Sequence, residues 1–219
     1  MNRRFESHLF WGFHSPLSAF TGAALIIMAS SRFAFALISA GALFWVYGFT
    51  ALVYSNAGAI MPGRGKMVIL LFLSTFFDGI FMFLTGLLNP MLILATGYIL
   101  ILVPPCCLGS GFFEASESID PIDVFSRALL EAGVLALIIL AFALIREPLG
   151  IGTLSFPGGA QGIIELFDSS DADGFVPARI LSASAGGLLL LGYGTALYRF
   201  LRERYSGITR YDEYPEEDQ

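Results

Sequence analysis

The stretch GIFMFLTGLLNPMLILATGYILILVPPCCLGSGFF, residues 79–113, lies between Asp78 and Glu114 and contains no charged side chain. A helix that crosses a bilayer needs about 20 mostly apolar residues. Asn89-Pro90 divides the stretch between two helices, because proline disfavours helical geometry in the residue before it and cannot donate to the previous turn. Similar charge-free runs flank it on both sides. The sequence therefore predicts an integral membrane protein.

The composition supports the same class. Of the 219 residues, 56% are apolar and 14% are charged, and the mean hydropathy is +0.73; globular proteins are roughly a quarter charged. The net charge of -6 comes mostly from loops and chain ends, and no basic stripe is present that would fit nucleic acid. We expect one compact, all-α bundle.

Six apolar runs are bounded by charged or turn-forming residues, and we expect each to be a transmembrane helix: residues 9–31, 33–54, 67–88, 91–113, 124–145 and 179–199. Pro16 leaves open the alternative that the first run is only a half-helix. Pro104-Pro105 interrupts the fourth run near its end, and the carbonyls freed there need partners inside the protein or a wet cavity. Pro148 and Gly150 are expected to end the fifth helix. The tail, residues 201–219, is expected to be polar and soluble.

The distribution of basic residues predicts the orientation. Six spans place both termini on one side, and nine of the twelve Lys and Arg residues lie on that side. The positive-inside rule then makes both termini cytoplasmic. The long acidic loop from Glu147 to Pro177 faces outward.

Asp78 is expected to lie within the third helix, after ten apolar or hydroxyl residues. Carboxylates inside membranes are costly and usually face a cavity or a partner. One interpretation is an ion or proton stop in a translocation path. The other is a residue near a membrane face, or a protonated carboxyl that bonds Ser74 one turn earlier.

Two segments form the most distinctive pairing in the chain. The first reads CCLGSGFFEAS from Cys106 to Ser116, and the second, one helix later, reads IREPLGIGTL from Ile145 to Leu154. Together they resemble the Rnf/Nqr family, whose membrane subunits have a Cys-x-x-Leu-Gly motif at a broken helix, then Ala-Ser, one helix, and an Arg-Glu-x-x-Gly-x-Gly-Thr-Leu turn. The resemblance extends over most of residues 15–200 and is stronger in the second half.

This resemblance implies a fold of two inverted three-helix repeats, residues 9–88 and 91–199, within one membrane domain, residues 1–200. Each repeat would contain a half-helix near the midplane, after Pro16 and around residues 104–111. It also implies a pseudo-symmetric pairing with a similar six-helix subunit, and further subunits of a redox-driven sodium or proton pump. The membrane would be the bacterial cytoplasmic membrane.

The cysteines depart from the family pattern. Family subunits each supply two cysteines, one from each repeat, to an intramembrane iron–sulfur cluster. This chain has none in the corresponding first-repeat stretch, residues 15–28, and an ungapped match places the family's second cysteine at Pro105. Cys106 and Cys107 are therefore either ligands of a [2Fe-2S] cluster shared with a partner subunit or small packing residues at a close helix contact. In this chain alone we expect no cofactor.

The turn after the fifth helix contains Arg146, Glu147, Gly150 and Gly152. It is interpreted either as a docking site for a partner subunit or redox domain, or as a helix stop followed by tight turns. If the two glycines hold positive φ angles, alanine at either position should lower the folded yield.

The leading hypothesis is a membrane subunit of an Rnf/Nqr-type ion-translocating electron-transport complex, serving as scaffold and part of the ion or electron path. It would be at most a non-catalytic subunit of a translocase, since no nucleotide-binding domain is recognisable. The alternative is a small ion or solute transporter, or channel-like protein, with the same inverted-repeat fold and no cofactor.

Overall fold

The computed structural model describes residues 16–57, 66–109, 121–158, 162–168 and 178–211. The helices are α1 (Pro16–Ala29), α2 (Phe33–Ala57), α3 (Lys66–Leu88), α4 (Pro90–Leu100), α5 (Val103–Gly109), α7 (Pro121–Gly150) and α9 (Ser184–Tyr211), with a 3-10 turn η1 (Arg179–Ser182) before α9. Two strands, β1 (Thr153–Pro157) and β2 (Ile163–Asp168), form an antiparallel hairpin.

Four segments of the described chain are long and apolar enough to cross a membrane: Phe33–Asn56, Val68–Leu88, Pro90–Gly109 and Ile122–Gly150. The first expected run is represented by α1, whose 14 residues span about 21 Å, short of a hydrocarbon core of about 30 Å. Its length fits the expected half-helix. The sixth expected span lies in α9, which is not among the four.

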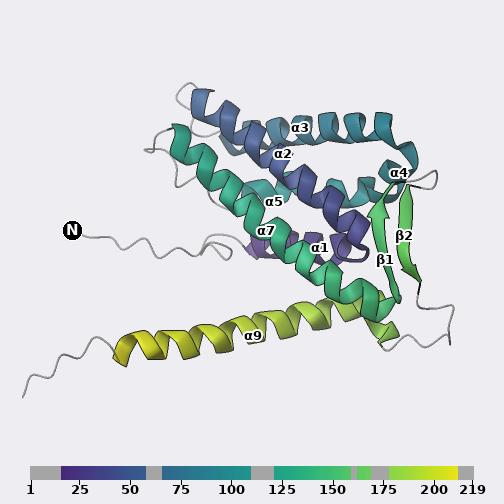
Figure 1. The fold of residues 1–219 in the computed structure, drawn as a ribbon. Helices are drawn as coiled ribbons and strands as arrows, with labels where there is room; N and C mark the ends of the chain where they lie inside the picture. Colours follow the sequence, from purple (N-terminus) through teal and green to yellow (C-terminus); the bar gives the residue numbers. More distant parts are fainter. Residues whose placement is uncertain (1–15, 58–65, 110–120, 159–161, 169–177, 212–219) are drawn as a thin grey trace, which may run out of the picture.

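The long helices α2 and α7 pack along each other more extensively than any other pair of described elements. Buried alanines line both sides of this contact, and small residues let two helices approach closely: Ala36, Ala40, Ala51, Ala128, Ala132 and Ala143. Figure 1 shows α3 and α9 on opposite edges of the molecule, with α2 and α7 between them. The short helices α1 and α5 pack against each other beside this pair.

Three boundaries differ from the expected ranges. The fourth run breaks at Ile101-Leu102, ahead of its prolines. Pro104 and Pro105 lie in the first turn of α5, where backbone N–H groups have no partner within the helix, so proline is tolerated there. The fifth helix continues through Pro148 to Gly150, because only two residues follow the proline and tertiary contacts hold this end. The last helix continues past residue 200 to Tyr211.

The hairpin was not expected within the acidic loop. Strand β1 packs against α2 and α7, and Thr153 and Ser155 on its inner face are buried. Gly152 precedes β1 with φ 81, and Gly162 precedes β2 with φ 85. Both values lie in the left-handed region that favours glycine. In Figure 1 the hairpin reaches from the end of α7 to the start of α4.

Candidate functional site

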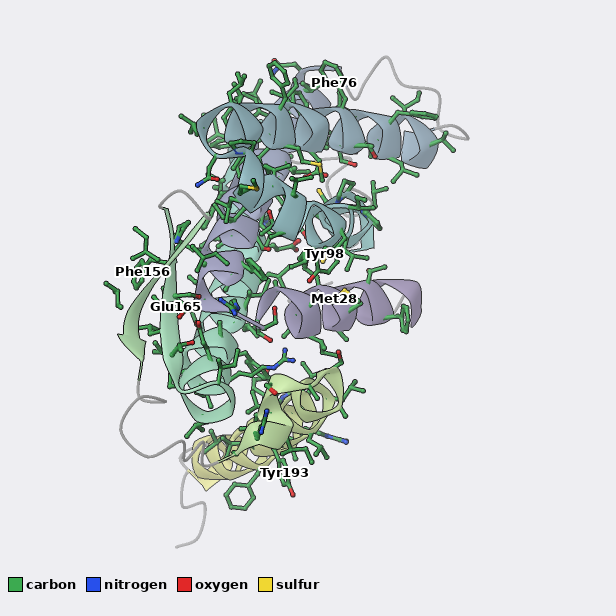
Figure 2. All side chains as sticks on the ribbon, turned by 90° about the vertical axis from the view of Figure 1, so that its right-hand side faces the viewer. Met28, Phe76, Tyr98, Phe156, Glu165 and Tyr193 are labelled. Atoms are coloured by element: carbon green, nitrogen blue, oxygen red, sulfur yellow. The ribbon has the colours of Figure 1, made fainter. Side chains whose placement is uncertain are left out.

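Asp78 lies on the inward face of α3. It is 3% exposed, in a row with the buried residues Leu70 and Ser74, whereas Phe72 and Phe76 on the outer face are 73% and 62% exposed. Figure 2 shows Phe76 on this outer edge of the molecule. The Oδ1 atom of Asp78 has no hydrogen-bond partner among the described residues. The expected alternative of a bond to Ser74 is absent there, because the Ser74 hydroxyl donates to the carbonyl of Leu71 at 3.0 Å.

The break between α4 and α5 lies as far along the chain from the α3–α4 corner as Asp78 does. Asp78 precedes the α3–α4 corner at Asn89 by 11 residues, and Leu100 follows it by 11, so both lie about 16 Å along their helices from that corner. Both α4 and α5 contact α3. Because proline has no N–H group, residues 104 and 105 cannot donate to the carbonyls of Leu100 and Ile101. A buried carboxylate on α3 and the break of a neighbouring helix therefore lie on elements in contact, and carboxylates and helix breaks are both features of cation sites.

The two cysteines lie deep in the core on α5. Cys106 is 7% exposed and Cys107 is fully buried. The buried Tyr47 of α2 donates its hydroxyl to the Cys106 carbonyl at 3.1 Å, which fixes α5 against α2.

Both cysteines are buried within this chain, which bears on whether they could ligate a cluster shared with a partner subunit. Such ligands need thiols that reach the surface where the partner's cysteines would arrive, and neither thiol does so here. No group of three or more His, Cys, Asp or Glu side chains in the described part of the chain could hold a metal ion. The packing interpretation of the two cysteines agrees with their burial.

Arg146, near the end of α7, is buried and ties three helix ends together. Its guanidinium carries five N–H donors in a fixed fork and suits several acceptors at once. Nε donates to the Leu181 carbonyl of η1 at 2.7 Å. Nη1 donates to the Ile27 carbonyl and to Ser30 Oγ, the latter at 3.1 Å. Nη2 donates to the carbonyls of Ser182 at 3.3 Å and Ala183 at 3.1 Å. The positive charge therefore lies at the C-terminal end of α1, where the helix dipole favours a cation.

Glu147 performs the complementary task at the next position. Its fully buried carboxylate accepts from the backbone N–H of Phe33, the first residue of α2, at 2.6 Å and from the Thr153 hydroxyl at 3.4 Å. A carboxylate at a helix N-terminus satisfies an otherwise unpaired donor and complements the helix dipole. Arg146 and Glu147 thus hold the α1–α2 break from both sides, and the turn has a structural role within the chain.

The two glycines of this turn are required for different reasons. Gly152 has φ 81, as expected. Gly150 does not have a positive φ, so that expectation was wrong; its constraint is space, because a Cβ there would lie 2.7 Å from the backbone N of Ser182. Close packing of η1 on α7 therefore requires glycine at position 150.

The structure brings Arg146, Glu147 and Gly150 together at one end of the bundle and places Asp78 and the cysteines in its interior. Sequence reasoning missed Tyr47, whose only signal is a hydroxyl within an apolar run, and Ser155, whose Oγ accepts from the N–H of Ala34 at 3.3 Å. No protein-family model matches the chain, and no curated protein matches it either.

Proposed function

We propose that this chain is a membrane subunit of an Rnf/Nqr-type ion-translocating electron-transport complex, in which it serves as scaffold and as part of the ion path. Asp78 would be the cation- or proton-binding group of that path. The observation that carries the proposal is the buried Asp78 carboxylate, whose Oδ1 has no hydrogen-bond partner among the described residues, on a helix that contacts the broken pair α4 and α5.

The order of the helices supports an inverted-repeat arrangement. In each half a short helix precedes long ones: α1 precedes α2 and α3, and α5 precedes α7 and α9. The corresponding short helices pack against each other, and so do the corresponding long helices α2 and α7. Inverted-repeat transporters place their sites near the midplane, at broken helices between the repeats.

A second candidate is a cofactor-free ion or solute transporter with the same fold. The burial of Cys106 and Cys107 favours it, because these thiols are not placed to serve a shared cluster. Under this alternative the chain would transport on its own, whereas a subunit would need the rest of its assembly.

Purification in mild detergent under anaerobic conditions separates the two candidates. Co-purifying membrane subunits, with iron and acid-labile sulfide in the assembly, are expected for the subunit. Reconstitution of the chain alone, followed by sodium and proton flux under an imposed membrane potential, tests the transporter. Flux by the isolated chain, with no co-purifying subunit, would replace the first proposal by the second.

Asp78→Asn tests the ion path in either case. The substitution preserves volume and removes the charge, so flux through the active preparation should fall at least tenfold. Asp123→Asn is the matched control, since Asp123 lies exposed in the first turn of α7. Equal flux in the two variants, at equal amounts of protein in the membrane, would refute the role of Asp78.

A further inference from the structure

Glu131 is a second carboxylate within a membrane-spanning helix. It lies well inside the span Ile122–Gly150 of α7, and its Oε2 atom is buried. Carboxylates inside membranes are costly and mark ion sites or close partners. Arg127 lies one turn earlier on α7, a spacing that allows an ion pair with Glu131. The position of Glu131 relative to Asp78 bears on which role applies.

Aromatic contacts between α2 and α3 fix the level of Asp78. The Trp45 ring of α2 packs on Phe81 of α3 with centroids 6.3 Å apart, and Phe49 packs on Phe77 with centroids 5.4 Å apart. The two helices therefore run in opposite directions along this contact. Asp78, which follows Phe77, is level with the segment of α2 between Trp45 and Phe49.

Close contacts between α2 and α7 fix the level of Glu131 in the same way. A Cβ on Gly48 would lie 3.6 Å from the Leu129 side chain, and a Cβ on Gly133 would lie 3.6 Å from the Phe44 ring. Glu131, midway between Leu129 and Gly133, is therefore level with the segment of α2 between Phe44 and Gly48. The two segments of α2 overlap, so the two carboxylates differ in depth by no more than about one helical turn, about 5 Å. Helix α2 packs against both of their helices (Figure 1).

Two hydroxyls of α2 lie within a turn of this level. Tyr47 donates to the Cys106 carbonyl at 3.1 Å and so faces α5. Thr50 is three residues later on the same face, is fully buried, and its Oγ1 atom has no hydrogen-bond partner among the described residues. Three other helical threonines donate to the carbonyl four residues earlier, at 2.7–2.8 Å: Thr75, Thr85 and Thr96. A buried oxygen without such a bond is unusual, and a bound ion is one way to satisfy it.

We propose that Glu131 is a second ion-binding carboxylate at the level of Asp78, and that a sodium ion bound there interacts with both carboxylates and with the Thr50 hydroxyl. The inference rests on the proposed function, in which Asp78 belongs to an ion path. In the proposed repeats α3 belongs to the first and α7 to the second, so the ion lies between them, where transporters of this kind place their sites. Carboxylate and hydroxyl oxygens are the ligands that a hard cation prefers.

Dicyclohexylcarbodiimide tests each carboxylate separately, because this apolar reagent reacts with protonated carboxyl groups inside membranes. The protein in proteoliposomes is treated in sodium chloride or in choline chloride at equal ionic strength, and mass spectrometry of its peptides measures the adduct at each residue. A bound sodium ion keeps a carboxylate ionised and protects it. Sodium should protect Asp78 and Glu131 over the same concentration range. Asp123, exposed in the first turn of α7, should show no dependence on sodium.

Asp78→Asn separates the ion site from an ion pair with Arg127. Removal of a unit charge roughly one helix diameter away, about 10 Å, should lower the affinity of Glu131 for a cation about tenfold. The sodium concentration that half-protects Glu131 should rise by that factor. An ion pair with Arg127 would leave the reaction of Glu131 insensitive to sodium. That insensitivity in the native protein, or an unchanged half-protecting concentration in Asp78→Asn, would overturn the inference.

Thr50→Val provides a second test that does not alter either carboxylate. It keeps the shape of the side chain and removes the hydroxyl, so the half-protecting sodium concentration should rise about fivefold, the factor for loss of one polar contact. Thr96→Val is the matched control, since Thr96 is equally buried and its hydroxyl is bonded to the Leu92 carbonyl. Equal concentrations in the two variants would also overturn the inference.

The outcome for Glu131 is separable from the outcome for the proposed function. Protection of both carboxylates without sodium flux in any preparation would keep the sodium site and refute the ion path. Flux that depends on Asp78, with Glu131 unprotected by sodium, would keep the path and refute the role of Glu131.

Discussion

Replacement of Arg146 should destabilise the whole bundle, because this one side chain, near the end of α7, satisfies acceptors at the ends of α1 and η1 and so joins three helix ends. Arg146→Met keeps a similar volume and removes every donor. A hydrogen bond to a charged group contributes about 1.5–3 kcal/mol, but the bonds share one side chain and do not add. The substitution leaves buried carbonyls without donors at about 1–3 kcal/mol for each such group, and for several groups served by one side chain a total of about 3–5 kcal/mol follows. We expect that loss in the free energy of unfolding, against a total of about 5–15 kcal/mol for a typical domain.

The assay is reversible unfolding in mixed micelles with increasing SDS, followed by circular dichroism at 222 nm. Arg146→Lys should lose about half as much, because an ammonium is a point donor that cannot reach acceptors on α1 and η1 together. Arg199→Met is the control, since Arg199 is exposed on α9. If Arg146→Met lost no more stability than Arg199→Met, the reasoning about the three helix ends would be refuted.

Further substitutions test individual contacts in the same unfolding assay. Gly150→Ala should lower the free energy of unfolding by about 1–3 kcal/mol, because its Cβ would overpack against η1. Gly152→Ala should lower it by about 1–2 kcal/mol through its positive φ. Gly79→Ala, on an open helix surface, should be neutral or stabilising, and a loss of stability there equal to the other two would refute the distinction. Tyr47→Phe leaves a buried carbonyl of α5 without its donor and should cost about 1–3 kcal/mol, so an unchanged midpoint would show that the bond contributes nothing. Glu147→Gln keeps an acceptor for the start of α2 and should lose less than Glu147→Ala, and equal losses would show that the charge and not the acceptor matters.

The spans that sequence predicted best are those bounded by charged or turn-forming residues. Helices α2 and α3 begin and end within a few residues of the predicted limits, because apolar length and the Asn89-Pro90 corner are local signals. Gly150, one of the two residues expected to end the fifth helix, does end α7, but passage of the helix through Pro148 could not be predicted from local signals, since proline normally stops a helix. Ser155, on the inner face of the hairpin, was missed because its partner Ala34 lies 121 residues earlier.

The candidate site was predicted in part. Asp78 and Arg146 were found because a charge in an apolar run is conspicuous by itself. Their surroundings were not, since the partners of Arg146 are backbone carbonyls, which every residue has, and the sequence does not mark which of them are left unpaired. The same holds for Gly150, whose need for glycine comes from a neighbour 32 residues later.

The bonds of Arg146 and Glu147 also constrain biosynthesis. The acceptor in α1 lies 119 residues before Arg146, and the donor in α2 lies 114 residues before Glu147. At about 5–20 residues per second, the ribosome needs roughly 6 to 24 s to make the intervening chain. Throughout that interval the end of α1 and the start of α2 are without these partners, so the first half of the protein reaches its final arrangement only after the second half has entered the membrane.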